Sequence, residues 1–214
     1  MKYNNKKLGI EKTDFQSIAK KFGTPAYCYS YSKLKENILN FKKNFEFFSP
    51  LICFSVKSNT NLNIIREIKK FGLGADVVSK GELMMALKAG VNPNKIVFSG
   101  VGKTTEEINF AIKKKILLIN AESKSEIQEI NKIAKKKKKI VSVGIRLNPN
   151  TDAKTLKQIS TGKSENKFGV NIKSFNELVN YCKIAKNINL KCLSVHIGSQ
   201  ILDYKPYERM LKVV

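Results

Sequence analysis

Short apolar runs alternate with amphipathic patterns of helical period along most of this chain. The runs that read as strands cover residues 26–31, 51–56, 74–78, 95–98, 116–119, 140–147 and 190–197. The patterns that read as helices cover residues 33–45, 62–71, 81–89, 105–113, 124–134, 174–185 and 207–213. This alternation is typical of a parallel sheet built from right-handed strand–helix–strand crossovers. The sequence therefore predicts an α/β fold.

Six of the predicted strands follow residue 51, and two architectures are compatible with that number. One is a TIM-type (β/α)8 barrel that is incomplete, with about six βα units, because a full barrel needs about 250 residues. The other is an open, doubly wound sheet. No G-x-G-x-x-G follows any predicted strand, so a dinucleotide-binding version of the open sheet has no support.

The chain is strongly basic, with 40 Lys and Arg against 17 Asp and Glu and a net charge of +23. Only Arg66, Arg146 and Arg209 are arginines, and arginine makes the commonest base-specific contacts. The lysines are spread along the chain, as a compositional bias would place them. We therefore expect nonspecific, salt-sensitive binding to polyanions and no specific nucleic-acid partner.

No apolar run approaches the roughly 18 residues that a membrane helix needs, so no membrane partner is expected. The first 12 residues lack the apolar stretch of a secretory signal, and a cytoplasmic location is predicted. The four cysteines are widely spaced without a C-x-x-C pair, which disfavours a zinc site and a disulfide framework. No metal is expected.

Polar and ionisable residues recur where the predicted apolar strands end. These positions are Lys57, Asp76 with Ser79, Ser99 with Gly100, Asn120, Arg146 with Asn148, and His196 with Ser199. Alone, Lys57 could be a strand-capping lysine and His196 a structural histidine. In a parallel barrel, however, the carboxyl ends of the strands meet at the mouth where chemistry takes place. The pattern as a whole predicts an active site there.

Several segments resemble one enzyme family. Residues 54–59 (FSVKSN) are similar to the Y-A-V-K-A-N segment of fold-type III pyridoxal-phosphate decarboxylases, and residues 74–83 (GADVVSKGEL) to their D-V-x-S-x-G-E-L. Residues 100–108 carry G-x-x-K-x-x-E-E-I. Residues 146–170 and 196–201 (HIGSQI) resemble the diaminopimelate decarboxylases in particular. The resemblance runs in order from about residue 23 to residue 214.

This resemblance implies an alanine-racemase-like N-terminal barrel that binds pyridoxal 5'-phosphate. Lys57 would form the internal aldimine with the cofactor, and His196 would stack on its ring. Ser199 would help to hold the phosphate, while Asp76 and Arg146 would lie beside the cofactor and orient it and Lys57. The loop from residue 152 to 168 would lie near a small-molecule amino-acid substrate.

The implied reaction is decarboxylation of meso-2,6-diaminopimelate to L-lysine. Residues 1–24 would form a polar extension with a short helix, and residues 25–214 a partial pyridoxal-phosphate-binding barrel domain. The family's glycine-rich phosphate loop, a Glu, a Cys, a Tyr and its C-terminal β-domain have no counterpart here. We therefore expect this chain to be inactive alone, and the full-length form to be a homodimer.

Two further functions remain open from the residues. One is a related decarboxylase that acts on ornithine or arginine, which HIGSQI disfavours. The other is a pyridoxal-phosphate-binding homologue that is non-catalytic or regulatory. A lysine-rich nucleic-acid binder is the weakest reading, because it gives no reason for the pattern at the strand ends.

Overall fold

The computed structural model describes residues 1–4, 7–153, 161–162 and 168–214. The chain forms two compact units, Met1–Ile52 and Cys53–Val214. The predicted domain boundary between residues 24 and 25 falls inside the first unit, in the segment between its two helices, and stays a prediction.

The first unit contains a small antiparallel sheet and two helices. Its elements are β1 (Lys2–Asn4), β2 (Lys7–Ile10), β3 (Thr13–Asp14), α1 (Phe15–Phe22), α2 (Tyr31–Asn44) and the 3-10 helix Glu46–Phe48. The side chain of Asp14 caps α1 and that of Ser30 caps α2. The predicted N-terminal helix and the helix at 33–45 are confirmed, whereas the β1–β3 sheet was not predicted.

The predicted strand at 26–31 is wrong. Residues 26–30 have no strand pairing within the described part of the chain, and Tyr31 already begins α2. An alternating pattern favours an extended backbone, but a strand also needs a neighbour that accepts and donates its ladder hydrogen bonds.

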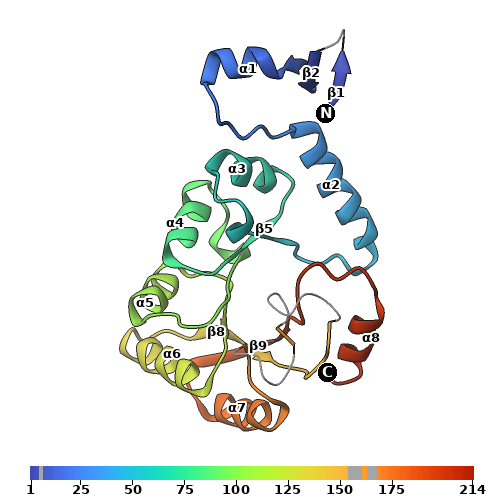
Figure 1. Cartoon of the computed structure of the whole chain (residues 1–214). Helices are drawn as coiled ribbons and strands as arrows, with labels where there is room; N and C mark the ends of the chain where they lie inside the picture. The colour runs from blue at the N-terminus through green and yellow to red at the C-terminus, as the bar shows by residue number, and fades with distance from the viewer. Residues whose placement is uncertain (5–6, 154–160, 163–167) are drawn as a thin grey trace. The chain divides into compact units, whose positions relative to one another are not determined.

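The second unit is a parallel α/β structure. Its strands are β4 (Cys53–Ser55), β5 (Gly74–Val77), β6 (Ile96–Phe98), β7 (Leu118–Ala121), β8 (Val141–Leu147) and β9 (Ile188–Val195). They are connected by α3 (Leu62–Lys70), α4 (Lys80–Lys88), α5 (Thr105–Lys114), α6 (Lys124–Lys136) and α7 (Ile172–Ile184), and α8 (Lys205–Leu211) follows β9. Figure 1 shows α3 to α7 in succession along one face of the sheet. The predicted α/β class is confirmed.

The strand order distinguishes the two architectures that the sequence left open. The sheet runs β4-β5-β6-β7-β8-β9, and every neighbouring pair is parallel. A doubly wound sheet reverses its order at a switch point, whereas a barrel adds each strand beside the previous one. This sheet has the barrel succession, with β4 and β9 as its described edges.

The two faces of the sheet differ in polarity because successive side chains alternate. Val77, Phe98 and Ile145 are fully buried in the core between strands and helices. The opposite face carries Ser55, Asp76, Asn120, Arg146 and Ser194. The register aligns Ser55 with Asp76 and Arg146 with Ser194, so these polar side chains gather toward the carboxyl end of the sheet.

No helix in the described segments is long and apolar enough to cross a membrane.

Candidate functional site

A cavity of about 790 Å³ lies at the carboxyl ends of the strands. It is lined by all five predicted site residues, Lys57, Asp76, Arg146, His196 and Ser199. Its other lining residues are Ser55, Ser58, Val78, Ser99, Gly100, Val101, Asn120, Glu122, Thr161, Phe168 and Ser194. The structure therefore brings the predicted set together from the turn after β4, from β5 and β8, and from the segment that follows β9.

Lys57 lies in the 3-10 turn Val56–Ser58 that follows β4. Val56 is fully buried and anchors this turn, while the Lys57 side chain is exposed in the cavity. Within the described ranges, the Lys57 amine forms no hydrogen bond or salt bridge. Its positive charge acts on both Asp76 and His196, and it lowers the pKa of each. This amine is therefore close to both groups and available to a ligand.

Asp76 is a partly buried carboxylate with a fixed donor. Burial raises its pKa, and this effect outweighs the hydrogen bond from Ser99 and the positive charges of Lys57 and Arg146, which lower it. Ser99 Oγ donates to Asp76 Oδ1 at 2.6 Å, and Asn120 Nδ2 donates to Ser99 Oγ at 3.1 Å. The carboxylate is thus held by Ser99, which Asn120 fixes in turn.

Arg146 is buried and held by a buried carboxylate. Its Nη1 donates to Glu122 Oε1 at 2.9 Å, and its Nη2 is 3.4 Å from the His196 carbonyl oxygen. The guanidinium lies 4.8 Å from the centre of the Phe168 ring. Arg146 therefore connects the ends of β7, β8 and β9.

His196 follows β9 and faces the cavity. Partial burial by the cavity wall lowers its pKa, as do the charges of Arg146 and Lys57, while Glu122 has the opposite effect. A pKa below the ordinary 6.5 leaves the imidazole neutral at pH 7. Thr161 Oγ1 donates to the His196 carbonyl oxygen at 2.9 Å, and the exposed Ser199 lines the same wall.

Glu122 is a site residue that the sequence analysis missed. It is 5% exposed, follows β7, and lies two residues after Asn120, so both side chains are on the cavity side. That spacing of two was the available signal. The predicted substrate loop at 152–168 lies mostly outside the described residues, although Thr161 and Phe168 do line the cavity.

A buried ion pair lies behind this wall. Lys103, whose side chain is 1% exposed, is 2.6 Å from Glu126 Oε1, and it donates at the same distance to the carbonyl oxygens of Gly100 and Asn120. Glu126 Oε2 accepts from the Glu122 amide at 3.2 Å. These contacts fix the backbone on which Asn120 and Glu122 stand.

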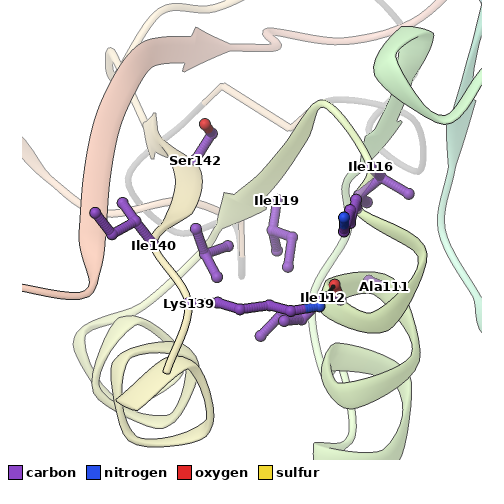
Figure 2. A pocket seen from close by; sticks show the side chains of 9 residues that line it. Ala111, Ile112, Ile116, Ile119, Lys139, Ile140 and Ser142 are labelled. Atoms are coloured by element: carbon purple, nitrogen blue, oxygen red, sulfur yellow. Dashed lines mark hydrogen bonds between the residues drawn. The ribbon is translucent and has the colours of Figure 1, made fainter. Parts of the chain in front are cut away.

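A second cavity of about 390 Å³ lies between α5 and the start of β8 (Figure 2). Its wall is mostly isoleucine and alanine, and Lys139 reaches across it to 3.4 Å from the Ile112 carbonyl oxygen. None of the predicted site residues lines it. Among all the described residues, no group of three His, Cys, Asp or Glu side chains could hold a metal ion.

The chemistry of the larger cavity fits a small, flat carbonyl compound that carries polar groups. An amine without a protein partner can condense with an aldehyde, and a neutral imidazole can lie against an aromatic ring. Two buried oxygens of residues that line the cavity, Ser55 Oγ and Asn120 Oδ1, have no hydrogen-bond partner among the described residues. Pyridoxal phosphate, which the sequence resemblance implies, meets these requirements.

The chain matches known proteins along its length. A family profile described as "Pyridoxal-dependent decarboxylase, pyridoxal binding domain" matches residues 31–214. A diaminopimelate decarboxylase of Aquifex aeolicus is 40% identical over 214 residues, which are 100% of this chain and 50% of that protein.

Solved structures show the same relationship. A crystal structure of diaminopimelate decarboxylase from Helicobacter pylori complexed with L-lysine is 42% identical, with a TM-score of 0.90, over 94% of this chain and 51% of that one. A diaminopimelate decarboxylase from M. jannaschii in co-complex with L-lysine is 35% identical, with a TM-score of 0.89, over 96% and 49%. The chain spans about half the length of the relatives it matches.

Proposed function

The chain belongs to the pyridoxal-dependent decarboxylases, and from that premise we propose that it forms the pyridoxal-phosphate-binding part of a diaminopimelate decarboxylase. The reaction of the whole protein is the conversion of meso-2,6-diaminopimelate to L-lysine. The observation that carries this proposal is the meeting of Lys57, Asp76, Arg146, His196 and Ser199 in one cavity. The crystal structures of relatives with L-lysine support a small amino acid as the ligand class.

Each of these residues has a role that its surroundings support. Lys57 would supply the amine that holds the cofactor through its aldehyde group. Asp76 orients that amine, because its carboxylate is fixed by Ser99 and lies within the electrostatic reach of Lys57. Neutral His196 offers a flat, uncharged face for the cofactor ring, and Ser199 offers a hydroxyl for its phosphate.

When bound, the cofactor supplies a conjugated ring that delocalises the electron pair left by loss of CO2. Arg146 contributes a positive charge at the cavity wall, and its partner Glu122 keeps that charge in one position. We further propose that the whole protein is a cytoplasmic homodimer, as the resemblance implies.

The attachment point is tested by trapping. The purified 214-residue chain is incubated with pyridoxal phosphate, reduced with borohydride, digested, and analysed by mass spectrometry. We expect the reduced cofactor on Lys57, and we expect Lys57→Ala to abolish the label. Lys88→Ala is the matched control, because Lys88 is an exposed lysine on α4 outside the cavity, and it should keep the label. Full labelling of another lysine in Lys57→Ala would refute the assignment.

The substrate is tested on the protein expressed from its complete gene. CO2 release is measured with meso-diaminopimelate, ornithine and arginine at equal concentrations. We expect the diaminopimelate rate to exceed the other two. A higher rate with ornithine or arginine would favour the related decarboxylase activity that the sequence left open.

A further inference from the structure

Among the described residues that line the cavity, Glu122 is the one acid classed as buried, and the proposed function gives it no contact with the cofactor. Its two carboxylate oxygens have different partners: Oε1 accepts from Arg146 Nη1, and Oε2 accepts from the Gly169 amide, both at 2.9 Å. Both partners are N–H donors, so each carboxylate oxygen accepts one hydrogen bond. Because Glu122 is only 5% exposed, water cannot replace either N–H donor without a cost in the free energy of folding.

Through these contacts one side chain ties together four segments of the site. Glu122 stands at the end of β7 and holds Arg146 of β8. Arg146 in turn reaches the His196 carbonyl oxygen after β9, and it packs on Phe168, next to Gly169. Glu122 bonds to both Arg146 and Gly169, and the backbones of Arg146 and Gly169 also lie close to each other.

We propose that Glu122 is a positioning residue for the pyridoxal-phosphate site, which acts through Arg146 to set the place and the electrostatic environment of His196. This inference rests on the proposed function for its consequence in cofactor binding. Its local geometry is a property of the chain itself. The proposed function and the positioning role of Glu122 can therefore be refuted independently of each other.

Glu122→Gln separates this role from simple packing, because glutamine has the same shape but only one acceptor oxygen. Its amide NH2 must then face either Arg146 or the Gly169 N–H, donor against donor. The charge of Arg146 also loses its neutralising partner. We expect pyridoxal phosphate to bind Glu122→Gln at least about tenfold more weakly, which corresponds to the loss of one charge-assisted hydrogen bond.

The single histidine of the chain provides a second measurement that needs no cofactor. The charged groups that act on the imidazole are Arg146, Lys57 and Glu122, and Glu122 alone raises its pKa. In Glu122→Gln, the pKa of His196 measured by NMR should therefore fall below that of the parent. Global loosening would move it in the opposite direction, toward the ordinary value of 6.5.

Two further variants complete the test. Glu106→Gln removes the same charge at a position that is 76% exposed, and it should change neither cofactor affinity nor the His196 titration. Glu122→Asp keeps the charge but is one methylene shorter, so it cannot reach both Arg146 and Gly169. It should weaken cofactor binding.

The outcomes are distinct. A lowered His196 pKa in Glu122→Gln with weakened cofactor binding supports the proposal. A parent chain that binds no pyridoxal phosphate, but whose His196 pKa still falls in Glu122→Gln, refutes the proposed function and keeps the positioning geometry. Parent affinity in both Glu122 variants, or a His196 pKa that is unchanged or raised in Glu122→Gln, overturns the inference.

Discussion

Asp76 shows how hydrogen-bond direction can orient a single functional group. The Asn120 amide nitrogen can only donate, so Ser99 Oγ accepts from it and must direct its one proton to Asp76. The carboxylate therefore receives a donor on Oδ1 in a fixed geometry. Burial nevertheless dominates, and the pKa of Asp76 is raised above its ordinary value of 3.8.

This raised pKa predicts a pH-dependent stability. Between pH 3.8 and the raised pKa, the folded chain holds a proton that the unfolded chain has lost, so Asp76 lowers the free energy of unfolding as pH rises through this window. Asp76→Asn lacks this titration. We expect the melting temperature of Asp76→Asn, relative to the parent, to increase as pH rises through the window and then to level off.

Asp203→Asn is the control for the Asp76 prediction, because Asp203 is exposed and does not line the cavity that contains Asp76. Its melting temperature relative to the parent should not show the same rise with pH. Thermal unfolding followed by circular dichroism at closely spaced pH values measures both differences. A difference for Asp76→Asn that stays flat or falls with pH would contradict the burial-dominated environment of the carboxylate.

For single residues, the sequence can predict a functional side chain where a polar residue ends an apolar strand. Lys57, Asp76, Arg146 and His196 each interrupt or follow an apolar run, so a local pattern locates them, and the structure places them in one cavity. The spacing from Asn120 places Glu122 on the cavity side but does not reveal its role, because that role comes from Arg146 and Gly169, which lie 24 and 47 positions away. Pairings over that separation depend on strand register, which no local pattern specifies.

Three strands of the sheet meet closely at one glycine. A Cβ placed on Gly144 of β8 would lie 2.2 Å from Asn120 Oδ1 of β7 and 3.1 Å from Cys192 Cβ of β9. The missing side chain is therefore what lets the Asn120 amide fit between the strands. Because Asn120 Nδ2 donates to Ser99, this space also supports the orientation of Asp76.

We predict that Gly144→Ala destabilises the chain by about 1–3 kcal/mol, the usual cost of overpacking a filled interior. Gly81→Ala is the matched control, since a Cβ on Gly81 in α4 would meet only Ser79 Oγ, at 3.7 Å. In a helix, the change from glycine to alanine should stabilise by up to about 1 kcal/mol. Urea unfolding measures both, and equal effects of the two substitutions would contradict the packing argument.

Elements were predictable where local chemistry marks their ends. Helices α4, α5 and α6 each begin after a Ser or Thr whose side chain accepts from the backbone, and their predicted starts fall within one residue. The strand predicted at 116–119 is observed as β7, Leu118–Ala121, because the apolar run begins before the ladder does. Pairing, not hydrophobicity, decides where a strand starts.

For the whole molecule, the excess of positive charge and the site are separate features. Around the larger cavity, Lys57 and Arg146 face Asp76 and Glu122, so its fixed charges nearly balance. The net charge of +23 must therefore be carried by the rest of the chain. A large charge of one sign opposes the compact state through self-repulsion, independently of what the cavity binds.

We therefore predict that added salt stabilises the chain. The Debye length falls from about 30 Å at 0.01 M to about 8 Å at 0.15 M, so repulsion between distant lysines is largely screened over this range. The melting temperature, measured by circular dichroism at pH 7, should rise with sodium chloride. Potassium chloride should give the same rise, because screening depends on ionic strength and not on the cation. A melting temperature that stays constant or falls would mean that the lysine excess does not oppose folding.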